Sequence, residues 1–392
     1  MRVLFFCVVP NGGMYQSLAE EFVRNGHEVQ FYSPSSVESS VDGSMPGIRK
    51  LFFKTGALTE VGMLKKAIST ISFSHNALRC FKKKLNPKEY DLILLSTPTI
   101  SYYETIKYAK KVNPKIKFYL ILRDIYPEAF KASNLAKIPF MYDYFKRLAQ
   151  KTYDIADIIG CMSPHSVSLV QENYCQGNKT KVVLLENWGE RESYKKPDIT
   201  IRSKYGLEGK FIVMYGGNLG APQNLGHILN LAKTQTEKKD LLFLFIGSGT
   251  QSELLKKRVK DEGISNVSIW DSMPRIEYEQ LLKTADLGLI SLRTRAHFAN
   301  IPSKTVSYMA NKIPIFASID KIGDYRSFII DRIKCGLWSF DDDLKTLSEN
   351  LDRLYNDSLL RKEMGENGRV YFEKYLTVDI TYKQILEQLG IK

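Results

Sequence analysis

The chain has 392 residues, of which 44% are hydrophobic and 25% charged, and its formal net charge is +13. This length suggests two or three domains, and the composition is that of a globular protein with a sizeable core. The chain contains no run of about 18 apolar residues, which argues against a transmembrane helix. The positive charge either lies on a solvated surface or faces nucleic acid, an anionic membrane or phosphorylated substrates.

The cysteine and histidine contents point away from a metalloprotein. Five cysteines, an odd number, are scattered without metal-ligand spacing, which is typical of free thiols in a reducing cytoplasm. The five histidines are equally dispersed. We therefore expect a cytoplasmic protein without a dedicated metal site.

The N-terminal stretch predicts the opening of a doubly wound parallel sheet. An apolar run at 2–9 is followed by Gly12-Gly13, by apolar residues at helical spacing, and by a strand at 29–32. We interpret the run at 2–9 as a buried strand, because it has one basic residue and no signal-peptide cleavage pattern. Two loop glycines, in place of the three of a dinucleotide fingerprint, support NAD binding only weakly. His27 is expected to close the helix.

Residues 58–85 form a basic segment with amphipathic spacing. Its single acid is Glu60, and it ends in Lys82-Lys83-Lys84. Basic amphipathic helices of this kind bind anionic membranes. The alternative is that these are ordinary core-facing helices with a solvated basic face.

Two further strands are predicted at 91–96 and 118–122, and the second runs directly into Arg123, Asp124 and Glu128. Ligands of open α/β sheets lie just beyond the carboxyl ends of the strands. Asp124 and Glu128 therefore stand where substrate chemistry is expected. The alternative for Asp124 is an ion pair with Arg123 or a helix cap.

The polar stretch at 187–197 follows strand-like runs at 155–162 and 181–185, and we interpret it as the linker between two domains. Beyond it the pattern begins again, with strand 211–215, glycine loop 216–220, helix 224–236, strand 241–246, glycine turn 247–249, helix 252–262 and strand 267–270. Two doubly wound halves facing each other form a cleft, where ligands usually bind. Helices are predicted at 348–355, 359–375 and 378–389.

The stretch 299–310 predicts a loop that leads into a helix. Pro302 suits the first turn of a helix, so that Ser303 and Lys304 lie at its N-terminus. The free N–H groups of such a terminus, together with a hydroxyl and a cation, are suited to a phosphate. The alternative is a loop-to-helix junction with an incidental lysine.

A nucleoside diphosphate requires close backbone approach and positive charge, which the loop 216–220 and the helix near Ser303 offer within one domain. Arg293 and Arg295 either add to this charge or lie on the surface. The acids Asp341-Asp342-Asp343 directly precede a predicted helix. Because acids favour a helix N-terminus, we prefer this role to a magnesium site.

Several of these segments together resemble the family-4 glycosyltransferases, which have the GT-B fold, and the resemblance runs to about residue 372. The segments that carry it are Pro302-Ser303-Lys304 with Ser307-Tyr308-Met309-Ala310 (the donor-site motif), Tyr215–Gly220 with Gln223-Asn224-Leu225 (the second-domain glycine loop), Asn187-Trp188 (the interdomain segment), and Gly12-Gly13 with Gly26-His27-Glu28-Val29 (the first-domain opening). The run Arg123–Glu128 is similar to the bacterial N-acetyl-fucosaminyltransferase-like branch, which builds O-antigen and capsule repeats.

The resemblance implies an α/β, GT-B fold with two doubly wound Rossmann-like domains facing a cleft. We expect an acceptor-binding domain at 1–190, a nucleotide-sugar-binding domain at 191–372, and a C-terminal helix at 373–392 that packs back on the first domain. The implied reaction is a retaining, metal-independent transfer without a cofactor. It moves a sugar, expected to be an N-acetylated deoxyamino sugar, from a UDP donor to an undecaprenyl-diphosphate-linked saccharide. Such an enzyme is expected on the inner face of the plasma membrane, bound peripherally through residues 58–85.

The resemblance also implies the residues of the site. The donor-binding residues are Gly216, Gly217, Asn218, Gly220, Ile301, Pro302, Ser303, Lys304 and Ser307. The residues on the acceptor side of the cleft are Gly12, Gly13, Arg123, Asp124 and Glu128. Lys304 is expected to stabilise the leaving diphosphate, and Asp124 to orient or deprotonate the acceptor hydroxyl.

The chain departs from the family at three positions. Two glutamates of most members are Ala299 and Ser307 here, and Ala221 replaces a basic residue after the glycine loop. Neutralisation of the diphosphate therefore depends more on Lys304. The alternatives are a UDP-sugar epimerase of the same fold, against which the dispersed histidines argue, and an inactive sugar-nucleotide-binding scaffold. Nucleic-acid binding is disfavoured, because the basic residues form no aromatic-interleaved patch or reading motif.

Overall fold

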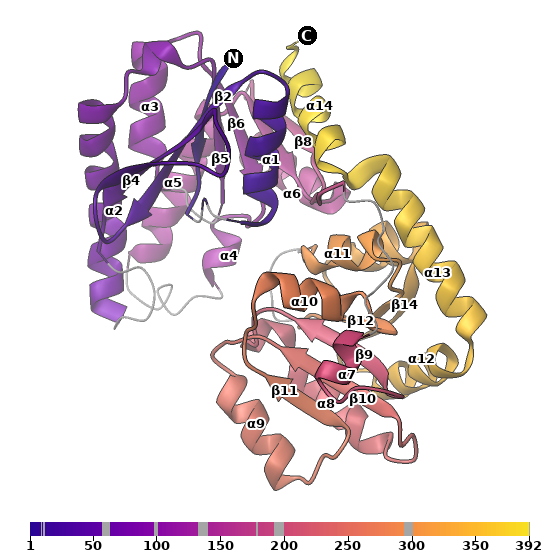
Figure 1. The fold of residues 1–392 in the computed structure, drawn as a ribbon. Helices are drawn as coiled ribbons and strands as arrows, with labels where there is room; N and C mark the ends of the chain where they lie inside the picture. Colours follow the sequence, from indigo (N-terminus) through magenta and orange to yellow (C-terminus); the bar gives the residue numbers. More distant parts are fainter. Residues whose placement is uncertain are drawn as a thin grey trace. The chain divides into compact units, whose positions relative to one another are not determined.

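The structure is a computed structural model that describes residues 1–8, 10, 12–56, 63–97, 101–131, 140–177, 179–191, 200–293 and 301–391. The chain divides into two compact units, Met1–Glu190 with Val378–Lys392, and Arg191–Thr377. Each unit is a mostly parallel sheet with helices on its faces (Figure 1). The predicted α/β fold of two doubly wound domains is confirmed.

The first domain is built on an eight-stranded sheet in the order β3-β4-β2-β1-β5-β6-β7-β8, parallel except for the edge pair β3–β4. Its strands are β1 Arg2–Phe6, β2 Glu28–Ser35, β3 Ser39–Asp42, β4 Ile48–Lys54, β5 Leu92–Ser96, β6 Lys117–Leu122, β7 Ile158–Cys161 and β8 Lys181–Leu184. Successive side chains of a strand point to opposite faces of the sheet. Val3 and Phe5 therefore enter one core cluster, whereas Leu4 and Phe6 enter another.

Helices cover both faces of this sheet, which explains why its central strands are apolar throughout. The helices of the first domain are α1 Gly13–Arg24, α2 Met63–Lys84, α3 Tyr103–Val112, α4 Glu128–Lys131, α5 Met141–Ile155, α6 Pro164–Tyr174 and α14 Val378–Leu389, with a 3-10 turn at Pro87–Glu89. Helix α1 ends as predicted from Gly26-His27. The N–H of His27 donates to the carbonyl of Phe22 (3.1 Å), and Gly26 has a φ of 79°, which closes the last turn.

The C-terminal helix α14 belongs to the first domain, as predicted, and lies beside α1 (Figure 1). Val378, Tyr382 and Ile385 are buried in the core cluster that also holds Val3 and Phe5. The Tyr382 hydroxyl lies 2.8 Å from His27 Nε2. The terminal helix thus completes a core that the first domain does not form from its own N-terminal residues alone.

The second domain contains a six-stranded parallel sheet in the order β11-β10-β9-β12-β13-β14. Its strands are β9 Phe211–Gly216, β10 Leu241–Ile246, β11 Val267–Trp270, β12 Leu287–Ser291, β13 Ile315–Ile319 and β14 Gly336–Phe340. Its helices are α7 Thr200–Lys204, α8 Leu225–Thr234, α9 Ser252–Asp261, α10 Arg275–Leu282, α11 Lys304–Ala310, α12 Leu344–Asn356 and α13 Ser358–Tyr371, with a 3-10 turn at Ala221–Gln223 and π-helical turns at Tyr325–Asp331 and Phe372–Leu376.

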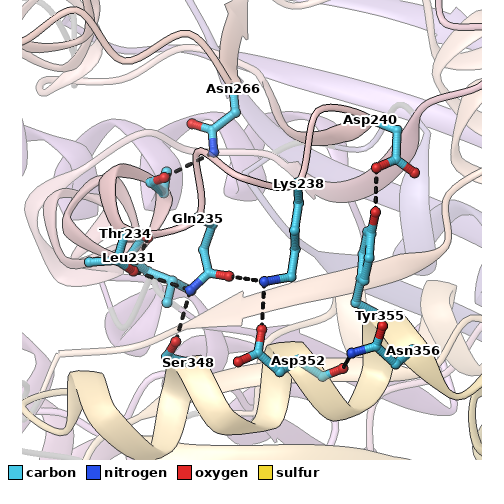
Figure 2. Close-up of polar contacts among 11 residues, drawn as sticks. Leu231, Thr234, Gln235, Lys238, Asp240, Asn266, Ser348, Asp352, Tyr355 and Asn356 are labelled. Atoms are coloured by element: carbon cyan, nitrogen blue, oxygen red, sulfur yellow. Dashed lines mark hydrogen bonds and ion pairs between the residues drawn. The ribbon is translucent and has the colours of Figure 1, made fainter.

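A polar network ties α12 to the segment between α8 and β10 (Figure 2). Gln235 donates through Nε2 to the Ser348 hydroxyl (2.8 Å), and Lys238 Nζ lies 2.6 Å from Asp352 Oδ1. Gln235 Oε1 also accepts from Lys238 (2.5 Å), which joins the two contacts into one network. These contacts hold α12, whose Leu347, Leu351 and Leu354 are buried in the core cluster of the second domain.

The basic segment 58–85 lies only partly within the described residues, because 57–62 fall outside them. Helix α2 begins at Met63, and its last turn, Lys82–Lys84, is exposed. Of the helices that the structure describes, none combines the length and apolarity needed to cross a bilayer.

Candidate functional site

The glycine loop after β9 is folded tightly against the turn after β10. The N–H of Gly217 donates to the carbonyl of Ile246 (2.9 Å), and that of Leu219 to the carbonyl of Ser248 (2.8 Å). A Cβ on Gly247 would lie 1.9 Å from the carbonyl oxygen of Gly217, so only glycine permits this approach. The two turns thus form one rigid backbone surface at the carboxyl edge of the sheet.

Helix α11 is fixed to the strands beneath it by Tyr308. The Tyr308 hydroxyl donates to the carbonyls of Met214 and Leu289, 3.1 Å from each, and links α11 to β9 and β12. The ring fills the space above Gly288, where a Cβ would lie 2.5 Å from it. The position of Lys304, the first residue of α11, is therefore determined by buried contacts one turn further along the helix.

Lys304 is brought to the glycine loop. Its Nζ lies 3.8 Å from where a Cβ on Gly217 would stand, and 3.6 Å from the ring centroid of Tyr215. Part of the Lys304 side chain is exposed, but its ammonium lies among protein atoms, and this desolvation lowers the pKa to about 7. The structure thus combines the predicted glycine loop and the predicted lysine in one place.

Four of the other predicted donor residues lie close to Lys304 in the chain. Ile301 is buried, Pro302 is partly buried, and Ser303 is exposed and stands before the first turn of α11 without a side-chain capping bond. Ser307 is exposed on α11, and Ala299 lies outside the described residues.

The sequence analysis also considered two arginines for the diphosphate and three acids for a helix N-terminus or a metal. Of the two arginines considered for the diphosphate, Arg293 donates its backbone N–H to Pro222, and Arg295 is not among the described residues. Of the acids at 341–343, Asp343 has the preferred role at a helix N-terminus, because its side chain accepts from the N–H of Thr346 at the start of α12. Asp342 instead pairs with Lys321, at 2.6 Å. Across the described ranges, no three His, Cys, Asp or Glu side chains gather in a group that could hold a metal ion.

In the first domain, Arg123 and Asp124 lie at the carboxyl edge of the sheet, where they were predicted. Thr97, directly after β5, accepts through Oγ1 from the backbone N–H groups of both residues, at 2.8 and 2.9 Å. The Arg123 guanidinium donates to the carbonyls of Leu185 (2.6 Å) and Glu186 (3.2 Å). The hydrogen bonds of this guanidinium therefore go to the segment after β8, and not to Asp124 as in the ion pair that we considered.

Asp124 is left as a partly buried carboxyl group at this edge. Burial raises its pKa, and the nearby positive charge of Arg123 opposes that rise. The two loop glycines of this edge both have φ in the left-handed region, 73° for Gly12 and 67° for Gly13, where α1 begins. The third predicted residue of this edge, Glu128, makes a contact within the first domain, because its Oε1 accepts from the Tyr174 hydroxyl on α6.

Three residues support the site, and the sequence analysis gave none of them a role. Thr97 orders the backbone at Asp124, Tyr215 contacts the Lys304 ammonium, and Tyr308 anchors α11 to the strands. Thr97 carries no local pattern, and Tyr215 and Tyr308 stand in motifs of the resemblance that do not say which groups these side chains contact. Their roles follow only from which strands become neighbours.

Comparisons with known proteins agree with this architecture. Residues 198–371 match the family model for glycosyl transferases group 1. Over 242 residues the chain is 26% identical to the probable glycosyltransferase WbjE of Pseudomonas aeruginosa, and the match spans 61% of this chain but only 60% of WbjE.

Solved structures cover the whole chain at low identity. Sucrose-phosphate synthase from Thermosynechococcus elongatus superposes with a TM-score of 0.78 at 15% identity, over 99% of both chains. Anabaena Alr3699/HepE, solved in complex with UDP, superposes with a TM-score of 0.70 at 16% identity, over 100% of both chains. The family model and these structures thus relate the chain, through its second domain, to the group 1 glycosyltransferases and give the whole chain the GT-B fold.

Proposed function

We propose that this protein is a retaining glycosyltransferase that uses a UDP-sugar donor. The observation that carries the proposal is the convergence of Lys304 with the rigid glycine loop at Gly217, which offers backbone and one cation to a diphosphate. The group 1 match of the second domain and the UDP bound by HepE support the choice of donor. Lys304 would stabilise the charge that develops on the leaving diphosphate.

The acceptor side of the proposal rests on the first domain. Asp124, at the carboxyl edge of its sheet, would orient or deprotonate the acceptor hydroxyl. We propose an N-acetylated deoxyamino sugar as the group transferred and an undecaprenyl-diphosphate-linked saccharide as the acceptor, as in bacterial surface polysaccharide synthesis. The resemblance of Arg123–Glu128 supports this finer assignment, whereas the name of WbjE supports glycosyl transfer alone.

The experiment that tests the donor site is thermal stabilisation by UDP, GDP, ADP and NAD, with the wild type and Lys304→Ala compared. A ligand at about 100 times its Kd should add roughly 2.7 kcal/mol of stability. Stabilisation by UDP alone, lost in Lys304→Ala, is the expected result. No shift with any nucleoside diphosphate would contradict the proposal. Interconversion of a UDP-sugar without an acceptor would identify an epimerase instead.

UDP binding should weaken as the pH is raised above 7. The pKa of Lys304 is about 7 in the free protein, so the amine is mostly neutral above that pH. A bound diphosphate favours the ammonium form, and binding therefore takes up a proton. The apparent Kd should rise by up to about tenfold per pH unit above 7. Calorimetry at several pH values, in buffers of different ionisation enthalpy, measures both effects, and a Kd independent of pH would exclude them.

We also propose that the basic face of the first domain binds an anionic membrane. The exposed lysines at the end of α2, Lys82–Lys84, are accompanied by exposed Lys107 on α3 and by Lys146 and Arg147 on α5. Attraction to anionic lipid is worth about 1 kcal/mol for each such side chain near the surface and is screened by salt. The protein should cosediment with vesicles that contain phosphatidylglycerol, in a salt-sensitive manner. Equal binding to purely zwitterionic vesicles would contradict this proposal.

A further inference from the structure

Tyr215 occupies an unusual place for a polar side chain. It is the last residue but one of β9, it is 0% exposed, and it lies in the core cluster of the second domain, edge-on to Phe245 at 6.1 Å between ring centroids. Its hydroxyl donates to the carbonyl of Asn218 (2.9 Å), within the glycine loop. One face of its ring is covered by the Lys304 ammonium, 3.6 Å from the centroid.

The surroundings of this ammonium hold aromatic groups where a carboxylate would be expected. Among the described residues, no acid forms an ion pair with Lys304, and desolvation is the cause of its lowered pKa. The titratable neighbours of this region are tyrosines: Tyr215 on β9, Tyr278 on α10 against Gly216, and Tyr308 on α11. Burial raises the pKa of all three, so they stay uncharged at neutral pH.

An aromatic face has a particular advantage beneath a lysine that must bind an anion. A carboxylate would neutralise the ammonium and would have to be displaced by the incoming diphosphate, at the cost of an ion pair in a desolvated site. The face of a ring attracts the ammonium without occupying an acceptor, and it leaves N–H donors on the far side available. The ring thereby determines from which side an anion contacts Nζ.

We propose that Tyr215 is a positioning residue that holds Lys304 for the diphosphate of the donor. This inference rests on the proposed function of the site. The ring of Tyr215 orients the ammonium, and its hydroxyl has the lesser role of bonding to the glycine loop.

The test is a double-mutant cycle on UDP affinity, measured by calorimetry. Above pH 7 the amine of the free protein is mostly neutral, and the ammonium that contacts the ring forms as UDP binds. A desolvated cation–π contact is worth about 1–2 kcal/mol, so at such a pH Tyr215→Leu should raise the Kd for UDP by about 5- to 30-fold. Tyr215→Phe, which keeps the ring, should restore affinity to within about threefold of the wild type. In a Lys304→Met background, Tyr215→Leu should have almost no further effect, because its role acts through the lysine.

Tyr278→Leu is the matched control, since Tyr278 packs against the glycine loop at Gly216 and no cation of the described ranges lies over its ring. Its effect on the Kd should be the same with and without Lys304. An equal penalty for Tyr215→Leu in both backgrounds would overturn the proposal. If Tyr215→Leu does not fold, Tyr215→Met fills the same space without a ring face and takes its place.

A second measurement separates this inference from the donor assignment. If the wild type binds no UDP, the proposed function fails, but the contact between ring and ammonium is still testable through amine reactivity. The pH midpoint of Lys304 acetylation, followed by mass spectrometry, should fall in Tyr215→Leu and remain unchanged in Tyr215→Phe. An unchanged midpoint in Tyr215→Leu would overturn the role of the ring.

Discussion

Replacing Lys304 with methionine should lower the rate of sugar transfer by about two to three orders of magnitude, the loss typical when a group that stabilises transition-state charge is removed. Methionine keeps the length and the apolar stem of lysine and removes only the ammonium. Lys304 Nζ lies beside Gly217, in the loop to which we assign the diphosphate. Initial rates with saturating acceptor measure the effect, and a rate near that of the wild type would remove the catalytic role.

Two controls separate this loss from damage to the fold. Lys260→Met, at an exposed lysine of α9, should leave the rate unchanged. The second control is the pH dependence of the free energy of unfolding, which should differ between Lys304→Met and the wild type. The folded-state pKa of Lys304, about 7, lies below its usual 10.5, so the unfolded chain binds more protons between these values. Wild-type stability should gain from this group as pH rises through that window, and the variant should lack the gain.

Replacing Asp124 with asparagine should lower transfer by about 10²- to 10⁴-fold while leaving UDP affinity unchanged. The carboxyl group lies in the first domain, and the glycine loop and Lys304 belong to the second. Burial raises the pKa of Asp124, so its carboxylate is a stronger base than that of a solvent-exposed aspartate. The rate should fall as pH drops through that raised pKa, and this acidic limb should be absent in the variant.

The exposed acid Asp143, in the first turn of α5, provides the comparison for this experiment. Asp143→Asn should retain both the rate and the acidic limb of the profile. A normal rate in Asp124→Asn would show that another group handles the acceptor hydroxyl. A parallel loss of UDP affinity would indicate that the substitution disturbs more than the acceptor side.

The sequence is sufficient for the fold where hydrophobic runs and glycine turns alternate, and insufficient where strands are polar or short. The buried strands β1, β5, β6 and β9 were predicted because they are continuous apolar runs. Strand β3 was not predicted, since all four of its residues, Ser39–Asp42, are exposed at the edge of the sheet. Its position follows from antiparallel pairing with β4, which is a tertiary property.

The same distinction applies to the site. The loop 216–220 and Lys304 were found because glycine turns and helix starts have local patterns. The ring of Tyr215 lies under Lys304 because α11 packs over β9. This packing joins residues about 90 positions apart, so no local sequence pattern predicts it. The ion pair considered for Arg123 was plausible from adjacency alone, but the segment after β8, two strands away from β6, supplies the Leu185 carbonyl as a partner.

The return of α14 to the first domain bears on how the protein is made. Val378, Tyr382 and Ile385 fill a core whose other members begin at Val3, so this domain is discontinuous in sequence. During synthesis the N-terminal part emerges from the ribosome first, yet its apolar face beside α1 stays uncovered until α14 has been translated. The second domain, continuous from Arg191 to Thr377, can complete its own core earlier. The second domain would then complete its core before the first domain, although the first domain begins earlier in the chain.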